Sequence, residues 1–508
     1  MDEQSNSKIA FKNVSTNLVL QAVIIISGFI IPKLLIGTFG SATYGLVASI
    51  TQFLALITLL QAGIGPVIKV KLYKCIAEKD KNKILLVLKD AAKFFRIIGY
   101  IFIVYSILLC FIYPLINDEF DKFLTISLII VMTVGTLMEY FFGLVYNIFL
   151  QADKKLFILN GVQIFCYIFN ILLVVLLIYC GANIIMVKIA NTIAFGIKPV
   201  FQAYYVKRKL KLRISEAKGE YKIDNKFDGL SQHVAFVINS STDVTVLTIF
   251  TNLTTVSVYA IYNLINTAVQ NFVAAFVTGM DAIFGDLFVR NEKERLRNSF
   301  QIYEFVYYTL STIIFLCTLV LIVPFISVYM RGVTDANYIQ PVFSIVFILA
   351  GFVLSARTIY SGLIYSVGHF KQTNFVAWIE AITNITLSII LVFKFGLIGV
   401  AIGTLVASSI RLSYFMFYAA KVVLNRSHLI GIKWIITCAI EIVACLFAMH
   451  FNILTYSPTN YFEWAIYAFI ILLIMTIFVL IINYIFNKEA FKNCFSFLKA
   501  KIKLKKEA

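Results

Sequence analysis

Long apolar stretches alternate with short polar breaks along the chain from residue 17 to residue 486. A helix needs about 20 mainly apolar residues to cross a bilayer, and fourteen of the stretches are long enough. They lie at about 17–38, 44–66, 97–116, 123–150, 157–180, 184–206, 229–251, 256–289, 300–328, 342–367, 373–393, 397–419, 434–454 and 464–486. This pattern predicts an all-α polytopic membrane protein with about 14 transmembrane helices.

Three of these stretches differ from a simple lipid-facing span. Residues 229–251 are polar for a lipid-facing helix, so we expect them to face protein or water. Residues 256–289 are long enough to tilt or to extend into the cytosol. The first sixteen residues are polar, and no small-residue cleavage site follows the first apolar stretch. Residues 17–38 are therefore expected to form a retained helix rather than a signal peptide.

Composition supports the membrane class. The chain has 508 residues, of which 60% are hydrophobic and 14% are charged, and its mean hydropathy is +0.89. These values are too apolar for an ordinary soluble domain. Eight cysteines form no CxxC pair and mostly fall inside predicted spans. We therefore expect neither a zinc site nor a disulfide framework, and no cofactor.

Basic residues are distributed unequally between the two sides of the predicted membrane. When the breaks are assigned alternately to the two sides, one side receives 36 of the 44 Lys and Arg residues, and the other receives only Lys122, Arg331 and Lys394. Basic loops stay in the cytoplasm, so both termini are predicted to be cytoplasmic and the number of spans to be even. The net charge of +18 is then mainly a topology signal, with a secondary attraction for anionic lipid headgroups and no implication of nucleic-acid binding.

Two long breaks lie on the basic side. Residues 69–99 alternate apolar and basic positions at near-helical spacing, which predicts an interfacial helix along the inner leaflet. Residues 207–228 mix both charge signs and are predicted to link two halves of the chain.

The chain contains an internal repeat. A shift of 214 residues aligns 159–171 with 373–385, and further matches occur at offsets of 213 to 215. The matched pairs are Asn160 and Asn374, Val162 and Val376, Ile168 and Ile382, Asn170 and Asn384, Ile171 and Ile385, Ser27 and Ser241, Tyr44 and Tyr259, Gly181 and Gly396, and Lys198 and Arg411. We therefore predict two six-helix bundles related by a pseudo-two-fold axis along the membrane normal, with two helices appended.

The predicted organisation has four parts: an N-terminal bundle at 1–206, a cytosolic linker at 207–228, a second bundle at 229–420, and helices 13 and 14 with a basic tail at 421–508. Transporters built from such repeats bind substrate at the repeat interface near the midplane and alternate access by rocking the halves. The pattern therefore favours a transporter over a channel or a membrane enzyme.

Three cations lie near the middle of predicted spans: Lys198, Arg357 and Arg411. They sit about nine to eleven residues from the basic ends of their spans, which is roughly 13 to 17 Å deep in a core about 30 Å thick. Charges at that depth are costly and usually functional, and arginine suits phosphate oxygens. Two readings stay open: they contact an anionic substrate, or they form internal ion pairs with acids at 139, 243, 380 or 441 while Lys198 snorkels to the cytosol. Lys33, near the outer end of the first span, is expected to snorkel outward.

Buried polar and acidic residues give further candidates. Asp243 and Asn239 lie in the polar segment "VINSSTDVTVLT", which would suit a sugar-lined wet cavity or could merely join helices. Glu139 and Glu380 lie mid-span and are candidates for binding a proton or sodium ion during transport, or for pairing with the arginines. His233, near the basic end of its span, is expected to be an interfacial residue rather than a ligand.

Residues 27–80 carry a family resemblance. Pro32 and Lys33 come late in the first span, followed by the dipeptides Phe39-Gly40 and Tyr44-Gly45 and by a Gly-x-Gly at 63–65 before a basic amphipathic stretch. The segments "LQADKKLFILN" at 150–160 and "LIYSVGHFKQTN" at 363–374 add to it. Across nearly its whole length the chain resembles the polysaccharide transporter family, the Wzx-type flippases of the multidrug, oligosaccharidyl-lipid and polysaccharide exporter superfamily.

The resemblance implies a function and a location. It implies a flippase that moves an undecaprenyl pyrophosphate-linked oligosaccharide, for O-antigen, lipopolysaccharide or capsule biosynthesis, across a bacterial inner membrane through a cationic central cavity. Lys198, Arg357 and Arg411 would supply those cations. Expected partners are the lipid-linked substrate, membrane lipids, a proton or sodium ion, and a polysaccharide polymerase with its chain-length machinery.

Two other functions compete with a flippase. A drug or metabolite antiporter of the same fold is the alternative, although a cavity for organic cations should be acidic. A glycosyltransferase or polymerase needs catalytic carboxylates or large outer loops, and the outer loops here are short, so no enzyme activity is expected. The sequence contains no GxxxxGK[ST] motif, which excludes an ATP-driven exporter within this chain.

Overall fold

The computed structural model describes residues 2–61, 64–217, 219, 230–276, 280–492, 494 and 496. Every regular element among these residues is a helix. Contacts divide the chain into two compact units, Met1–Ala260 and Ile261–Ala508, and each is described by itself.

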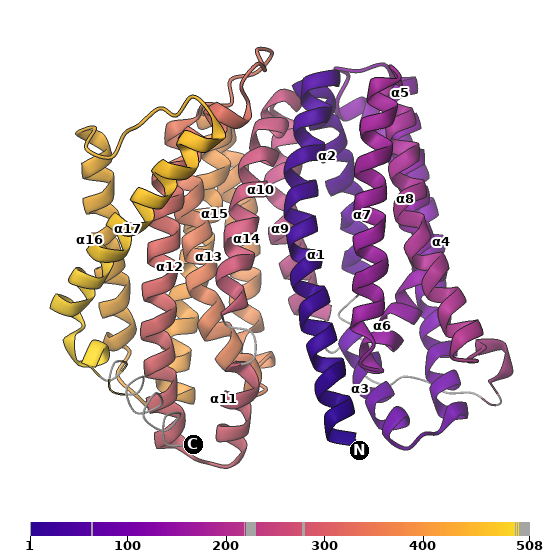
Figure 1. The fold of residues 1–508 in the computed structure, drawn as a ribbon, viewed down its shortest axis with the longest axis horizontal. Helices are drawn as coiled ribbons and strands as arrows, with labels where there is room; N and C mark the ends of the chain where they lie inside the picture. The colour runs from indigo at the N-terminus through magenta and orange to yellow at the C-terminus, as the bar shows by residue number, and fades with distance from the viewer. Residues whose placement is uncertain are drawn as a thin grey trace. The chain divides into compact units, whose positions relative to one another are not determined.

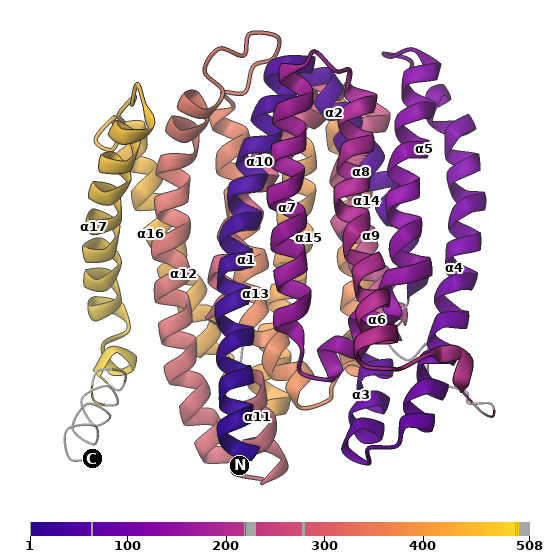
Figure 2. The ribbon, with the colours of Figure 1, turned by 45° about the vertical axis from the view of Figure 1, so that its right-hand side comes forward.

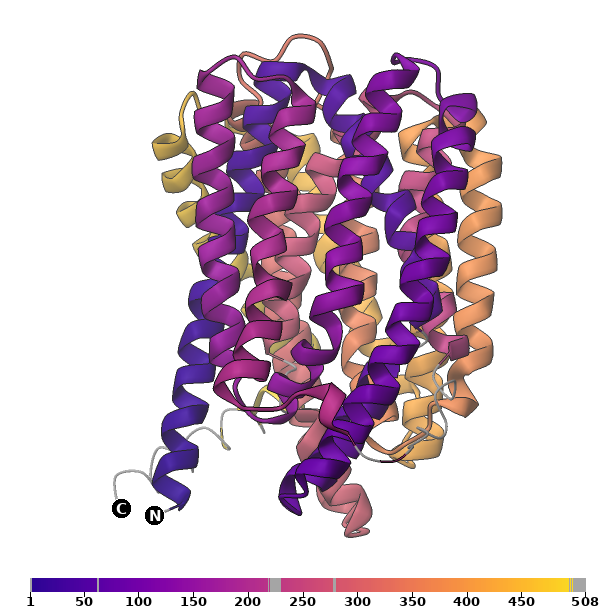
Figure 3. The ribbon, with the colours of Figure 1, turned by 90° about the vertical axis from the view of Figure 1, so that its right-hand side faces the viewer.

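Unit 1 is built from long helices joined by short turns. It contains α1 (Asp2–Phe39), α2 (Ser41–Ala55), the 3-10 helix η1 (Leu56–Gln61), α3 (Ile64–Ala77), α4 (Lys81–Ile116), α5 (Lys122–Met138), the π turn η2 (Glu139–Gly143), α6 (Leu144–Ala152), α7 (Leu156–Tyr179), α8 (Ile184–Tyr204), the π turn η3 (Tyr205–Lys209), the 3-10 turn η4 (Ile214–Glu216), α9 (Leu230–Phe250) and the first part of α10 (Leu253–Ala275). Helix α7 packs between α1 and α8, and α8 packs on α5, which packs on α4 (Figure 2). The indigo N-terminal turns of α1 extend past most of this unit (Figure 3).

Unit 2 repeats this plan and adds two helices. It contains the rest of α10, α11 (Met280–Val289), α12 (Lys293–Tyr329), α13 (Pro341–Ser366), the 3-10 turn η5 (Lys371–Thr373), α14 (Asn374–Phe395), α15 (Leu397–Tyr418), the π turn η6 (Ala419–Val423), α16 (Leu429–His450) and α17 (Tyr461–Phe486). Helices α13 and α14 both pack on α15, while α16 and α17 pack on α12 at one side of the unit (Figure 1).

The structure supports a multi-pass membrane protein. Among the described residues, thirteen helices are long and apolar enough to cross a membrane. The eighth predicted span, 256–289, corresponds to α10 and α11, which are separate helices and are not among the thirteen. The polar residues of α10 lower its hydropathy, and the predicted single long span is wrong because the described helix ends at Ala275.

The predicted interfacial helix over 69–99 is also wrong as a single element. Its residues are divided between α3 and the first turns of α4. Lys79 adopts a positive φ of 55°, and the Asp80 side chain accepts a hydrogen bond of 3.0 Å from the backbone N–H of Lys83. This cap starts α4, so a turn interrupts the helical pattern that the sequence shows as continuous.

The helices recur at the repeat spacing found in the sequence. The corresponding elements are α1 and α9, α2 with η1 and α10, α3 and α11, α4 and α12, α5 through α6 and α13, α7 and α14, α8 and α15, and η3 and η6. Positive φ values also recur 214 residues apart, at Lys154 and Gly368 and at Lys211 and Asn425. The duplicated plan of the predicted fold is therefore present in the local structure of the chain.

The contact units and the predicted bundles divide the chain at different places. Unit 1 extends to Ala260 because α9 packs against α2 and η1. The predicted linker at 207–228 lies partly outside the described residues. The four-part division, with a second bundle at 229–420 and a tail at 421–508, stays a prediction based on the repeat.

Candidate functional site

The centre of unit 2 holds a carboxylate shared by two arginines. Glu380 on α14 is fully buried, Arg357 comes from α13 and Arg411 from α15. Arg357 Nη1 donates to Glu380 Oε1, and Arg411 Nη1 donates to Glu380 Oε2 at 2.5 Å. The three residues meet because α13 and α14 pack on the same helix, α15.

The two arginines of this cluster have more N–H donors than the acceptors around them satisfy. Two guanidinium groups and one carboxylate give a formal charge of +1. Arg411 also donates from Nη2 to the Tyr365 hydroxyl at 3.2 Å and lies 5.0 Å from the centre of the Phe415 ring. Its Nε is buried without a hydrogen-bond partner among the described residues. The Arg357 side chain is 16% exposed, so it is the member of the cluster that an incoming anion could reach most easily.

Unit 1 has a smaller ion pair at a π turn. Lys198 Nζ on α8 lies 3.1 Å from Oε1 of Glu139, the first residue of η2. The second carboxylate oxygen is buried without a partner among the described residues. Gly143 makes room for it, because a Cβ at Gly143 would lie 2.4 Å from Glu139 Oε2 and 3.0 Å from the Pro199 side chain. π turns inside helices often occur at functional sites.

The polar stripe on α9 forms hydrogen bonds within unit 1. The Tyr259 hydroxyl donates to Asp243 Oδ2 at 2.9 Å, and Asp243 is buried. Gln52 Nε2 on α2 donates to the Ser241 hydroxyl at 2.7 Å. Asn239 is half-buried on the same helix. The sequence leaves two roles open for this polar segment, lining a wet cavity or joining helices. The contact of Ser241 with Gln52 joins α9 to α2 and fits the second role.

The structure brings the predicted cations and the predicted ion-coupling acids together. Arg357 and Arg411 both contact Glu380, and Lys198 contacts Glu139 rather than reaching along its helix as a snorkelling side chain. The three cations are therefore not unpaired charges that wait for a substrate, because each has a carboxylate partner in the protein. Any role for these residues in substrate binding or ion coupling must therefore involve exchange of an internal partner.

The remaining charged candidates lie apart from these clusters. Glu441 on α16 is fully buried and accepts a 3.4 Å hydrogen bond from Asn483 of α17. His233 Nε2 lies 2.8 Å from the Thr58 carbonyl oxygen, which accepts a hydrogen bond from it. Among the described residues, no group of His, Cys, Asp and Glu side chains could hold a metal ion.

Sequence reasoning missed a second buried ion pair in unit 2. Arg426 Nη2 lies 2.7 Å from both carboxylate oxygens of Glu304, which also accepts from the Tyr360 hydroxyl at 2.7 Å. The Arg426 side chain is only 4% exposed. The sequence places Arg426 among the basic residues of a loop, and it does lie in the loop between η6 and α16. The sequence does not predict that this arginine is buried against Glu304 of α12. The only available signal was the arginine itself, in a chain with 34 lysines and 10 arginines.

Known structures share this fold, although no family model and no curated protein sequence matches the chain. The structure is similar to the inward closed conformation of the Lipid II flippase MurJ, with a TM-score of 0.69 and 17% identity over 94% of this chain and 99% of that one. It is similar to the inward-facing conformation of a multidrug resistance MATE family transporter of the MOP superfamily, with a TM-score of 0.64 and 15% identity over 79% of this chain and 96% of that one. The MATE transporter VcmN of Vibrio cholerae, in its bent form, has a TM-score of 0.52 and 13% identity over 82% and 97% of the two chains.

Identities this low establish the fold and leave the substrate open. The resemblance inferred from residues 27–80 concerned the same superfamily, and the fold agrees with it. The chain is thus an all-helical membrane protein with the fold of MurJ and of the MATE transporters of the MOP superfamily.

Proposed function

We propose that the protein is a flippase that carries an undecaprenyl pyrophosphate-linked oligosaccharide from the cytosolic to the outer face of a bacterial plasma membrane by alternating access. The Glu380 cluster is the observation that supports this most strongly. It presents two guanidinium groups on facing helices, with a net positive charge and unused donors. Arginine pairs of this kind suit the oxygens of a phosphate or pyrophosphate.

In this proposal Glu380 is an exchangeable counterion. A buried guanidinium needs a partner, because an unpaired charge in the membrane interior is expensive. Glu380 supplies that partner when no substrate is present. An arriving pyrophosphate would compete for the same N–H donors, first at the partly exposed Arg357, and departure of the product would return the arginines to Glu380.

The same reasoning gives a role to the acids as ion-coupling residues. Protonation of Glu380 would weaken its hold on both arginines and favour substrate binding, and Glu139 would do the same for Lys198. In this scheme the coupling ion is a proton rather than sodium. Both carboxylates already have a cationic partner in the place where a sodium ion would have to bind. Asp243 and Asn239 on α9 would contact sugar hydroxyl groups in this scheme.

The wider biological setting follows from the proposed substrate. Surface glycans assembled from lipid-linked units, such as O-antigen, other lipopolysaccharide or capsule, would be the product pathway. A polymerase and its chain-length machinery would act on the flipped unit at the outer face. Both termini would then lie in the cytoplasm, on the side where most basic residues are predicted.

The proposal is tested by neutralising both arginines. The double variant Arg357→Gln/Arg411→Gln should remain inserted in the membrane but cause undecaprenyl-linked glycan to accumulate on the cytosolic side in a strain that depends on this protein. The double variant Arg357→Lys/Arg411→Lys is the matched control and should retain part of the transport, because it keeps both charges. A normal amount of surface glycan in the Arg357→Gln/Arg411→Gln strain would contradict the proposal.

The alternative is a drug or metabolite antiporter of the same fold. The similarity to MATE transporters and the buried acid Asp243 favour it. It is distinguished by measuring drug susceptibility in the same strains. Loss of drug resistance with unchanged lipid-linked glycan in the Asp243→Asn variant would favour the antiporter.

A further inference from the structure

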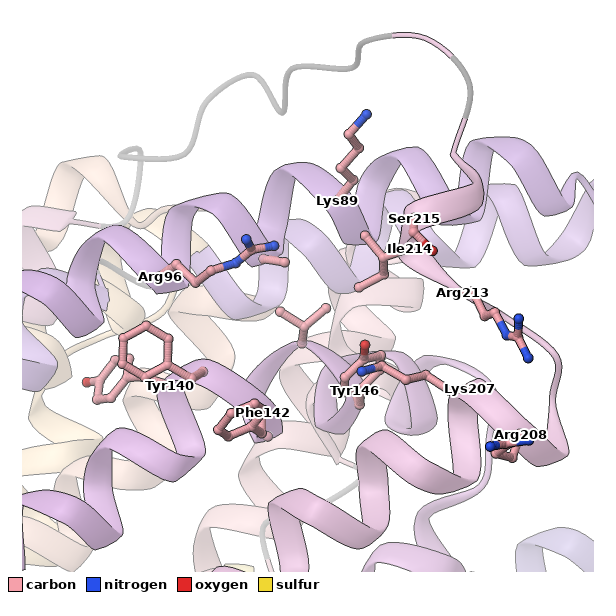
Figure 4. Close-up of a pocket in the computed structure, with 14 residues that line it drawn as sticks. Lys89, Arg96, Tyr140, Phe142, Tyr146, Lys207, Arg208, Arg213, Ile214 and Ser215 are labelled. Atoms are coloured by element: carbon pink, nitrogen blue, oxygen red, sulfur yellow. The ribbon is translucent and has the colours of Figure 1, made fainter.

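Unit 1 contains a basic cavity that the proposed transport mechanism does not use. Its volume is about 740 Å³, and it lies between α4, the π turn η2, α6 and the segment after α8 (Figure 4). Five cationic side chains line it together with aromatic ones. The cations are Lys89, Arg96, Lys207, Arg208 and Arg213, and the aromatic residues are Tyr140, Phe141, Phe142 and Tyr146.

Among the described residues, none of these five cations forms a salt bridge. Lys207 instead lies over the ring of Tyr146, with its Nζ 5.8 Å from the ring centre. By contrast, neighbouring lysines outside the cavity do have acidic partners: Lys81 with Glu216, and Lys83 with Glu78. The cavity therefore concentrates positive charge that a bound anion would neutralise.

The outer face of α4 links this cavity to an apolar surface. Lys89, Lys93 and Arg96 follow one another at helical spacing and are all exposed. The next residues on that side are large, apolar and exposed. They are Ile97 at 50%, Tyr100 at 61%, Ile101 at 45% and Val104 at 59%. Cations above an exposed apolar stripe form the arrangement that meets a headgroup and its acyl chains at a membrane surface.

The corresponding face in unit 2 is covered by protein. Helix α12 corresponds to α4 in the repeat, and 67% of its most apolar segment is buried compared with 33% for α4. Helix α17 packs there: Trp464 Nε1 donates to the Leu321 carbonyl oxygen at 3.4 Å, and its ring centre lies 5.1 Å from that of Phe325. Leu321 and Phe325 match Ile107 and Phe111 of α4, which are exposed. Unit 1 has the same helix surface without appended helices of its own to cover it.

The buried ion pair of unit 2 occupies the place of the cavity. Tyr146 of unit 1 corresponds, at the offset of 214, to Tyr360, and Leu212 corresponds to Arg426. In unit 2 these two residues converge on Glu304 in a site that is closed to solvent. In unit 1, Tyr146 lines an open cavity that five cations also line, and Leu212 leaves the arginine position without a charge.

We propose that this cavity binds the phosphate group of an anionic membrane lipid, whose acyl chains lie along the exposed face of α4. The lipid then covers the apolar face of α4 as α17 covers the matching face of α12. Its phosphate group neutralises the cations at the end of that face. Basic pockets between transmembrane helices are established binding places for anionic lipid headgroups. This inference does not depend on the proposed flippase activity.

The test compares lipid binding by matched variants of the purified full-length protein in detergent, using native mass spectrometry with added phosphatidylglycerol or phosphatidylcholine. The variant Arg96→Gln/Lys207→Gln/Arg213→Gln should bind phosphatidylglycerol on the order of tenfold more weakly than the unaltered protein. The control Arg290→Gln/Lys293→Gln/Arg297→Gln removes three exposed cations from unit 2 and should bind it as the unaltered protein does. All the replaced side chains are exposed, so the variants should fold.

Two further measurements separate the possible sources of the phosphate. The variant Arg96→Lys/Arg213→Lys keeps all charges and should retain binding. Phosphatidylcholine, which has no net charge, should bind weakly to every form. Equal losses of phosphatidylglycerol in the cavity variant and the control variant would overturn the proposal, and so would displacement of the lipid by an equal concentration of inorganic pyrophosphate, which would indicate a site for a soluble phosphate.

Discussion

Single buried charges in this protein are stabilised by their partners. Glu380 accepts hydrogen bonds from two arginines at once, and Glu304 accepts from Arg426 through both of its oxygens. Removing one member of a buried ion pair is costly because the other charge remains in a low-dielectric surrounding. Each of these acids therefore affects stability as well as any transport role.

The variant Glu380→Gln should destabilise the protein strongly. It leaves Arg357 and Arg411 close together without a carboxylate, and losing one partner of a buried pair typically costs roughly 3 to 5 kcal/mol. A thermal melt of the purified protein in detergent measures the change. The triple variant with Arg357→Gln and Arg411→Gln added is the control.

That triple variant should recover most of the lost thermal stability, because no uncompensated charge remains. A triple variant as unstable as Glu380→Gln alone would show that Glu380 acts through packing on α14 rather than through the two arginines.

Gly45 shows why the Tyr-Gly dipeptide of the second span requires glycine. A Cβ at this position would lie 1.8 Å from the backbone oxygen of Leu253, at the start of α10. The same turn is fixed by Glu119, whose side chain accepts a 2.9 Å hydrogen bond from the Leu253 N–H. Helix α2 can approach this backbone only when no side chain intervenes.

The variant Gly45→Ala should therefore reduce the yield of folded protein, because the backbone oxygen cannot move away cheaply. Size-exclusion chromatography of membranes solubilised in detergent measures the folded fraction. The control Gly37→Ala lies in α1 with nothing within 4 Å of the added atom, and it should be neutral or slightly stabilising. Equal yields for the two variants would contradict the close approach.

At the scale of elements, the π turn η2 positions an acid. It lies between α5 and α6, and Gly143 leaves space for the carboxylate of Glu139 beside Lys198. An α-helical continuation would rotate Glu139 relative to α8. The local helix geometry and the ion pair therefore depend on each other.

The variant Gly143→Ala should separate Glu139 from Lys198, because the new Cβ would occupy space within 2.4 Å of the carboxylate oxygen. We expect a loss of transport, measured as accumulation of lipid-linked glycan, that is larger than the loss of thermal stability. The control Gly135→Ala on α5 meets only ordinary contacts of 3.6 Å and should behave like the unaltered protein. Normal transport by Gly143→Ala would show that the ion pair is dispensable.

Hydropathy predicted nearly every helix, since a run of about 20 apolar residues has few alternatives to crossing a bilayer. It did not predict the turn at Lys79, because the amphipathic pattern continues through it, or the division between α10 and α11, because the apolar stretch continues across it. The π turns were also missed, since one extra residue in a turn leaves the hydropathy unchanged.

The candidate site was predicted as residues but not as contacts. Glu380, Arg357 and Arg411 stood out as charges in apolar runs, yet their pairing depends on how α13, α14 and α15 pack. Glu304 and Arg426 did not stand out, because both lie near span ends where charges are common. Depth in a span is readable from sequence, whereas the choice of partner is a tertiary property.

At the scale of the whole molecule, the distribution of basic residues predicts a topology that a native cysteine can test. Cys180 is exposed in the turn between α7 and α8, on the side predicted to be outside. A maleimide that cannot cross the membrane should label Cys180 in cells whose outer barrier has been removed. The other described cysteines are buried or, for Cys110, half-buried inside a span.

The variant Cys180→Ser should abolish that labelling and is its control. Labelling that appears only after the membrane is permeabilised would place the turn in the cytoplasm and reverse the topology. The same result would invert the direction of the proposed transport without changing the fold.

The π turns η3 and η6 begin at Tyr205 and Ala419, one repeat length apart. Two independent insertions at matching places are improbable, so a single insertion in an ancestral half-length gene, copied when that gene doubled, is the simpler history. Both descendants then kept an irregularity that one codon deletion could erase. Deleting one residue from either π turn would restore a regular α-helix. It would show whether the protein still needs the rotation that the extra residue gives to the residues that follow.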